Sequence, residues 1–216
     1  MEEVLAVYAR PRDPRRPLVC FDEAGKDLKA HTRSPQPAAP GRDAREDSEY
    51  ARHGSRNLFL ACAPHLGWRQ IAVTERRTAV DFAHALRELV DGQFPQAERI
   101  VLVLDNLNTH TPAALYQAFA PAEAWRILER LEWHVTPQHG SWLNMAELEL
   151  SVLARQCLAR RIPDAATLEA EVTSWVAARN AEGLTISWHF TQEDARQRLH
   201  WLYPHPASDT FIRSVH

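Results

Sequence analysis

Residues 100–104 (IVLVL) are apolar at every position, and the run stops abruptly at Asp105 and Asn106. A strand that is apolar on both faces is typical of the interior of a sheet that helices cover on both sides. This run is the strongest buried-strand signal in the sequence. It restricts the chain to folds that contain a central, fully covered sheet.

The rest of the sequence alternates between strand and helix patterns. The segments with strand patterns are 18–23, 58–63, 70–73 and 133–135, and the second and third read as a hairpin-like pair around Pro64 and Gly67. The segments with helical patterns are 80–94, 112–131 (one or two helices), 142–161 with Ser141 as N-cap, 164–182 and 190–203. This order predicts a mixed α/β sheet flanked by helices.

Three stretches lie outside this pattern. Residues 1–17 are rich in arginine and proline and predict an extended lead-in outside the core. Residues 31–57 are polar and interrupted by prolines and a glycine, which predicts a long surface excursion. Residues 204–216 are expected to form a C-terminal tail, so that the predicted domain covers 18–203.

The composition is that of a soluble globular protein, with 45% hydrophobic and 25% charged residues in a chain of 216. No run approaches the ~18 uncharged apolar residues that a membrane helix requires. The acidic start of the chain does not resemble a signal peptide. Cys20, Cys62 and Cys157 lack paired spacing, which excludes a disulfide framework or zinc ribbon and predicts a reducing cytoplasm.

The charge of the chain gives two opposing indications about a nucleic-acid partner. The net charge of −3 argues against one. Lys26 and Lys29 are the only lysines among 25 basic residues, and arginine makes up the rest. Arginine grips phosphates bidentately, but a GC-rich genome also favours arginine. Composition alone does not choose between these explanations.

Two aspartates stand where apolar strand patterns end. Asp22 follows the first apolar segment and Asp105 follows the most apolar one. In α/β sheets, sites are built at the ends of central strands. A carboxylate there is costly unless it is solvated, paired or bound to a cation. Taken singly, an aspartate at a strand end also suits a turn or a cap.

Glu147 is the third acid in an unexpected place. It falls inside the arc of its predicted helix that is marked by Leu143, Leu150, Ala154 and Leu158. A glutamate on an apolar stripe must either reach solvent or meet a positive charge. Glu149 lies about 160° away around the helix and is expected on its flank.

Together these acids suit a hard divalent cation, because Mg²⁺ prefers oxygen ligands. Two aspartates and a helix glutamate can hold two such ions for phosphodiester chemistry. The sequence contains no GxxxxGKS/T loop, no GxSxG elbow and no HExxH or CxxC zinc set. His110 and His139 suit either phosphate contacts at the edge of a site or plain loop positions. Trp142 suits either stacking on a base or a core position at the helix start.

Three segments carry a resemblance to a known family. Residues 19–23 (VCFDE), 102–110 (LVLDNLNTH) and 136–147 (TPQHGSWLNMAE) resemble, in order, the signature blocks of bacterial insertion-sequence transposases of the mariner superfamily. The resemblance covers about 18–203 and implies an RNase H-like catalytic core. It also implies that Asp22, Asp105 and Glu147 are the metal-binding catalytic triad, with Glu23 and Glu149 as the near alternatives.

The resemblance implies a DNA-cutting and strand-joining enzyme. Such a domain would use Mg²⁺ or Mn²⁺, with two ions, to cleave the ends of a transposable element and join them to target DNA. A homodimer and a location at the bacterial nucleoid are implied as well. Family members usually carry N-terminal helix-turn-helix domains, which we expect to be absent here and supplied by a separate subunit or reading frame. The 41 residues between Asp105 and Glu147 exceed the spacing in many relatives, with an apparent helical insertion around 113–131.

Basic residues outside the triad are candidate contacts to the DNA backbone, although a solvated charged face explains them equally well. These candidates are Arg52, His53, Arg56, Arg155, Arg160 and Arg161, besides His110, His139 and Trp142 at the site. Two alternatives to a transposase remain at this stage. One is a non-catalytic DNA-binding or assembly remnant, whose DNA binding would not depend on Mg²⁺ or Glu147. The other is an RNase H-like nuclease with a different substrate.

Overall fold

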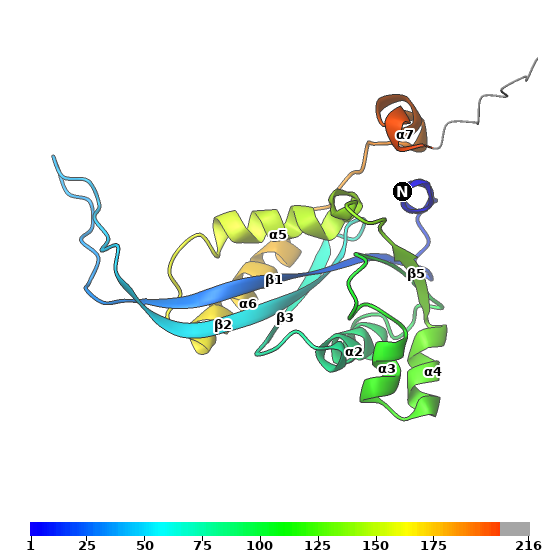
Figure 1. Ribbon diagram of the computed structural model, residues 1–216, viewed down its shortest axis with the longest axis horizontal. Coiled ribbons are helices and arrows are strands. Elements are labelled where there is room, and N and C mark those ends of the chain that lie inside the picture. Colours follow the sequence, from blue (N-terminus) through cyan, green and yellow to red (C-terminus); the bar gives the residue numbers. More distant parts are fainter. Residues whose placement is uncertain (204–216) are drawn as a thin grey trace, which may run out of the picture.

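The computed structural model describes residues 1–203 and is built around one five-stranded sheet (Figure 1). The strands are β1 (Leu18–His31), β2 (Tyr50–Ala63), β3 (Trp68–Thr74), β4 (Ile100–Leu104) and β5 (Leu131–Val135). Their order in the sheet is β3-β2-β1-β4-β5. The β1–β2 and β2–β3 pairs are antiparallel, whereas β1–β4 and β4–β5 are parallel. The sheet is therefore mixed, as predicted.

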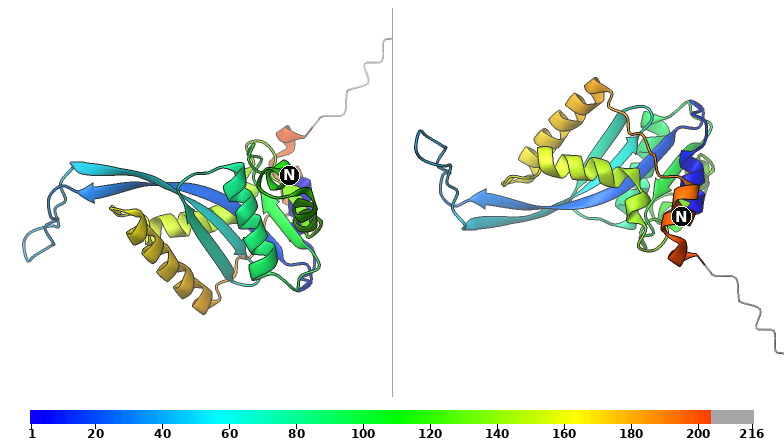
Figure 2. Two further views of the ribbon diagram at one scale, coloured as in Figure 1. Left: turned by 90° about the horizontal axis from the view of Figure 1, so that it is seen from below. Right: turned by 90° about the horizontal axis from the view of Figure 1, so that it is seen from above.

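Helices cover both faces of the sheet (Figures 1 and 2). One face carries α2 (Ala79–Glu88), the π-turn η1 (Leu89–Gln93), α3 (Ala113–Ala118) and α4 (Pro121–Glu129). The other face carries α1 (Glu2–Tyr8), α5 (Met145–Gln156), α6 (Ala165–Glu182) and α7 (Gln192–Arg198), together with the 3-10 turns η2 (Ser141–Leu143) and η3 (His200–Leu202). None of the helices in the described part of the chain has the length and apolarity needed to cross a membrane.

The central strand predicted from the sequence is β4. Ile100, Leu102 and Leu104 pack in the core beneath α2–α4, whereas Val101 and Val103 face the core beneath α5 and α6. None of the five is more than 5% exposed. Burial of each such side chain contributes about 1.5–3 kcal/mol, so this strand anchors both cores.

The β1–β2 hairpin is longer than the sequence pattern predicted. Beyond the sheet, residues 24–31 and 50–57 continue as a two-stranded ribbon that projects from the body (Figure 2). The first strand therefore does not end at its carboxylates, and Asp22 lies inside β1 opposite Leu60. Hydrogen bonds between the two strands hold the ribbon together, and its Leu28 is 2% exposed and joins the core beneath α5 and α6. Part of the predicted surface excursion is thus strand, and only 32–49 connects the two strands.

The expectation of an extended, core-free lead-in is wrong for residues 2–8, which form α1. Val4, Leu5, Val7 and Tyr8 are buried, and Tyr8 Oη donates to the main-chain oxygen of Leu143 at 2.6 Å. Because residues 1–17 as a whole are rich in arginine and proline, the short apolar helical pattern in the first half of this segment was not predicted from the sequence. As a result, the amino-terminal helix packs beside α7 and near η2 (Figure 1).

Two further boundaries differ from the prediction. The helix expected over 142–161 is split into η2 and α5, and its N-cap is Asn144 rather than Ser141, because the Asn144 side chain accepts from the Ala146 N–H at 3.1 Å. The segment 112–131 contains two helices, one of the two alternatives predicted, and the strand that follows begins at Leu131 rather than at Trp133. The tail predicted over 204–216 lies outside the described residues.

Candidate active site

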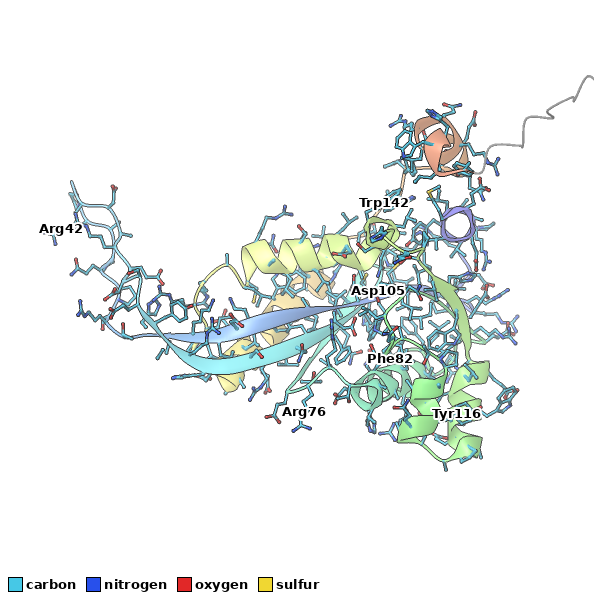
Figure 3. The ribbon with its side chains drawn as sticks, in the orientation of Figure 1. Arg42, Arg76, Phe82, Asp105, Tyr116 and Trp142 are labelled. Carbon is cyan, nitrogen blue, oxygen red and sulfur yellow. The ribbon has the colours of Figure 1, made fainter. Side chains whose placement is uncertain are left out.

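The register of the sheet brings two acids together. Phe21 of β1 pairs with Leu104 of the parallel strand β4, so the next residues, Asp22 and Asp105, follow at the same level. Asp22 is buried at 6% exposure, and the Asp105 side chain is 20% exposed at the end of β4. Figure 3 shows Asp105 near the centre of the molecule, above the helix that carries Phe82. One carboxylate is thus buried and its neighbour opens to solvent.

Asn144 fastens the third element to these two. Its Nδ2 donates to the main-chain oxygen of Phe21 at 2.8 Å and lies 3.4 Å from Asp22 Oδ2, while its Oδ1 caps α5. Asn144 is fully buried. Glu147 follows in the first turn of α5 and is half-buried. One amide side chain therefore holds the helix that carries Glu147 against the strand that carries Asp22.

The carboxyl group of Asp22 has a pKa that its surroundings shift upward. Burial raises the pKa of Asp22 to about 7, and the main-chain N–H of Glu23, 2.8 Å from Oδ1, opposes part of this rise. The negative charges of Glu147, Asp105 and Glu23 raise this pKa further. Like charges within a few ångströms disfavour ionisation of a carboxyl group. The site therefore concentrates negative charge that a cation would offset.

His110 lies between two other acids of the cluster. Its Nε2 is 2.7 Å from Glu23 Oε1, and its Nδ1 is 2.5 Å from Asp105 Oδ1. Burial lowers the pKa of His110, but the hydrogen bonds to Asp105 and Glu23 outweigh burial and raise this pKa to about 9. The predicted phosphate contact by His110 is not what the structure shows, because its side chain is fully buried.

Glu23, Asp105 and His110 offer ligand atoms within 4.8 Å of one another. The two ring nitrogens of His110 face different carboxylates, however. This arrangement is a hydrogen-bonded chain through the imidazole, rather than three donors that point at a common centre.

A family profile matches most of this chain. The profile described as DDE superfamily endonuclease covers residues 17–169, a range that includes Asp22, Asp105 and Glu147. The chain belongs to the DDE superfamily of endonucleases. No curated protein sequence matches it.

The fold of this DDE endonuclease is similar to that of Mos1 mariner complexes. The Mos1 paired-end complex with Mg is 20% identical, with a TM-score of 0.57 over 93% of this chain and 59% of the Mos1 chain. The paired-end complex with Mn is 19% identical, with a TM-score of 0.53 over 82% and 52%. The pre-cleavage transpososome is 18% identical, with a TM-score of 0.56 over 94% and 61%. The likeness confirms the predicted RNase H-like fold, and the chain spans only about half to three fifths of the Mos1 chain.

Glu149, the near alternative for the third acid, lies elsewhere in the DDE endonuclease. It is 2% exposed rather than on the flank of its helix, and it contacts Arg69 Nη2 at 3.2 Å and Arg179 Nη2 at 3.0 Å. The apolar helix face predicted through Leu143 and Ala154 is wrong, because the helix begins only at Met145 and Ala154 is exposed. The position of Glu149 therefore favours Glu147 as the acid that faces the site.

The basic candidates for DNA contact lie mostly on the ribbon and at the turn after α5. Three of them, Arg56, Arg160 and Arg161, line an open groove of about 830 Å³. The other charged residues that line it are Lys26, Lys29, Asp27 and Glu46. Arg42, in the connection 32–49, lies beyond the ribbon at the end of the molecule farthest from Asp105 (Figure 3). The groove is separate from the acidic cluster.

Several of these candidates already have partners within the chain. His53 Nδ1 contacts the Pro163 oxygen at 2.8 Å, and Arg160 pairs with Glu171. Arg161 pairs with Glu46 at 2.7 Å and donates to main-chain oxygens of the connection 32–49. These contacts support structural roles: His53 joins the ribbon to the turn between α5 and α6, Arg161 joins this turn to the connection 32–49, and Arg160 joins it to α6.

The remaining candidates are accessible. Arg52, Arg155 and His139 are exposed, and His139 has a positive φ of 62° in the turn after β5. Trp142 is 45% exposed and packs edge-on against Phe190 with the ring centres 5.5 Å apart. Trp142 is thus neither a fully buried core residue nor an aromatic ring that is entirely free to stack on a base.

Asn144 was not among the predicted site residues, and its role gives a first test. Asn144→Ala should lower the free energy of unfolding by about 2 kcal/mol, because it removes a helix cap and a buried hydrogen bond. It should also lower the DNA cleavage rate about 100-fold, because a displaced helix misplaces Glu147. Urea unfolding and a plasmid nicking assay measure the two effects. Gln197→Ala, at an exposed position of α7, is the control, and undiminished cleavage by Asn144→Ala would count against the role.

Proposed function

We propose that this chain is the catalytic domain of a transposase that cuts and joins DNA with divalent cations held by Asp22, Asp105 and Glu147. The observation that carries the proposal is the placement of these acids on adjoining elements: Asp22 lies in β1, Asp105 directly follows the neighbouring strand β4, and Glu147 lies in the first turn of α5, which Asn144 holds against β1. Family membership and the fold shared with Mos1 complexes support the same function.

The residues present fit a hard cation. The three carboxylates offer only oxygen ligands, which Mg²⁺ and Mn²⁺ accept. The Asp105 side chain is 20% exposed at the end of β4, so this carboxylate is accessible to a cation from solvent. The charges around Asp22 are negative, and a cation would relieve their repulsion. The printed descriptions of the Mos1 complexes name Mn and Mg.

Each residue has a distinct task in this proposal. Asp22 in β1 and Asp105 directly after the neighbouring strand β4 would hold the cations together with Glu147 from the helix α5. Asn144 fixes the spacing between strand and helix. Two bound ions would activate the attacking water or 3′-hydroxyl and stabilise the departing oxygen. The chain's own contribution is to hold the carboxylates in place before DNA arrives.

The proposed partners are the ends of a transposable element and a target DNA, met by a homodimer at the nucleoid of the cell. The Mos1 structures are described as paired-end and strand-transfer complexes. Exposed Arg52, Arg155, His139 and Trp142 are the accessible candidates for DNA contact. Arg56 is a further candidate on the ribbon. Such contacts neutralise phosphates and position the duplex without reading its sequence.

Cleavage of supercoiled plasmid by the purified chain tests the proposed function. We expect nicking that appears with Mg²⁺ or Mn²⁺ and stops with EDTA, because the acids cannot act without a cation. DNA binding that ignores Mg²⁺, with neither nicking nor cation binding, would contradict the proposal and indicate an assembly remnant. Cation-dependent cutting of RNA–DNA hybrids in preference to duplex DNA would instead indicate a different nuclease.

A further inference from the structure

Glu23 and His110 form a buried polar pair that the proposed chemistry does not use. The exposed fractions of their side chains are 1% and 0%. Side chains alternate along β1, so Glu23 points to the face covered by α2, whereas Asp22 points to the face covered by α5. The pair thus lies behind the catalytic acids rather than among them.

We propose that His110, braced by Glu23, is a positioning residue that fixes the side chain of Asp105 for cation binding. This inference rests on the proposed function, because it assigns a task at the same site. It makes neither Glu23 nor His110 a ligand. Both ring nitrogens of His110 are already directed at carboxylates, so no free nitrogen faces a cation.

The contacts around His110 leave its ring little freedom. Its main-chain N–H donates to the Leu107 oxygen at 2.9 Å, which closes the turn after β4. The ring packs against Phe82 with the centres 4.5 Å apart, and its edge faces Phe21 at 6.0 Å. Glu23 Oε1 holds Nε2 at 2.7 Å. Phe82, Phe21 and Glu23 therefore hold the His110 ring independently of Asp105.

Asp105, in contrast, depends on His110. Among the described residues, His110 is the only side chain that the structure places within ion-pair distance of the Asp105 carboxylate, at 2.5 Å. Asp105 begins an irregular segment that continues to α3, where no strand partner restrains it. A side chain at such a place would sample several rotamers without an external contact. His110 supplies that contact.

Stability alone does not account for the pair. Glu23 Oε2 is buried without a hydrogen-bond partner, and a buried ion pair is often no more stable than apolar residues of the same size. Groups that orient metal ligands commonly carry such costs, and their loss lowers metal affinity about 10–100-fold. A chain from Glu23 through His110 to Asp105 has this arrangement.

Two substitutions of His110 separate positioning from packing. His110→Asn places an amide near the position of Nδ1 and keeps a donor for Asp105, whereas His110→Gln places an amide near Nε2 and keeps a donor for Glu23. Both remove the ring from Phe82, so their packing losses are similar. Free Mn²⁺ measured by electron paramagnetic resonance gives the cation affinity, and plasmid nicking gives the rate.

We expect His110→Gln to lower Mn²⁺ affinity about 10–100-fold and His110→Asn to retain most of it. Equal affinities in the two variants, or a greater loss in His110→Asn, would overturn the proposal. If His110→Gln fails to fold, His110→Phe replaces it, because it keeps a ring against Phe82 and removes both nitrogens: reduced Mn²⁺ affinity of the folded variant supports the proposal, and unchanged affinity overturns it. Absence of Mn²⁺ binding by the unaltered chain would overturn the proposed function itself, which distinguishes the two failures.

Discussion

Asp105→Asn is expected to abolish DNA cleavage while the protein remains folded. The substitution keeps the size of the side chain but replaces a carboxylate oxygen, at the open end of β4, that a cation needs. Loss of several kcal/mol of transition-state stabilisation corresponds to a rate decrease of about 10³-fold or more. The initial rate of plasmid nicking in Mg²⁺ measures the effect, and a thermal melt followed by circular dichroism checks the fold.

The matched control for this variant is Asp91→Asn. Asp91 lies on η1 and pairs with Arg126 at 2.8 Å on an exposed surface. Its loss should change the melting temperature little and cleavage not at all, because exposed ion pairs contribute about 0–1 kcal/mol. Glu147→Gln should behave like Asp105→Asn. A folded Asp105→Asn chain that still cuts DNA would remove Asp105 from the proposed ligands.

Glu149→Ala is expected to have the largest effect on stability, lowering the free energy of unfolding by about 3–5 kcal/mol. The Arg69 side chain is 1% exposed and pairs with Glu149 at 3.2 Å. Its other contacts are neutral oxygens of residues such as Gly67 and Leu184. Removal of Glu149 would leave a buried positive charge without a negative partner. Urea unfolding monitored by tryptophan fluorescence measures the loss.

Glu123→Ala is the control for Glu149→Ala, because its ion pair with Arg126 is exposed and should contribute about 0–1 kcal/mol. A loss below about 1 kcal/mol in Glu149→Ala would show that water or a rearranged Arg179 compensates for the missing carboxylate. Glu149→Gln, where it folds, should still cleave DNA. That result would distinguish the structural acid of α5 from Glu147, two residues earlier.

The elements that could be predicted from the sequence are those whose signal is local. β4 was predictable because every residue in 100–104 is apolar, and the ends of apolar segments pointed to Asp22 and Asp105. The ribbon was not predictable in the same way. Its residues beyond Ala24 pair with residues 19 to 32 positions away in the sequence, and their side chains carry no apolar alternation.

The parts of the site that could not be predicted depend on contacts across the fold. Asp22 and Glu23 are neighbours in the sequence. Only the register of β1 decides which of the two side chains faces α5. Asn144 precedes the helix and is a common capping residue type. The hydrogen bond from its side chain to Phe21, however, joins residues 123 positions apart in the sequence. The burial of His110 likewise arises from the packing of α2 against the turn after β4.

The most direct test of the central claim is the position of Mn²⁺ in crystals of the chain, located by its anomalous scattering. We expect a peak bound to the carboxylates of Asp22 and Asp105 on the side that faces Glu147. A peak coordinated by His110 and Glu23, or no peak in this cluster at saturating Mn²⁺, would contradict the assignment of the three acids.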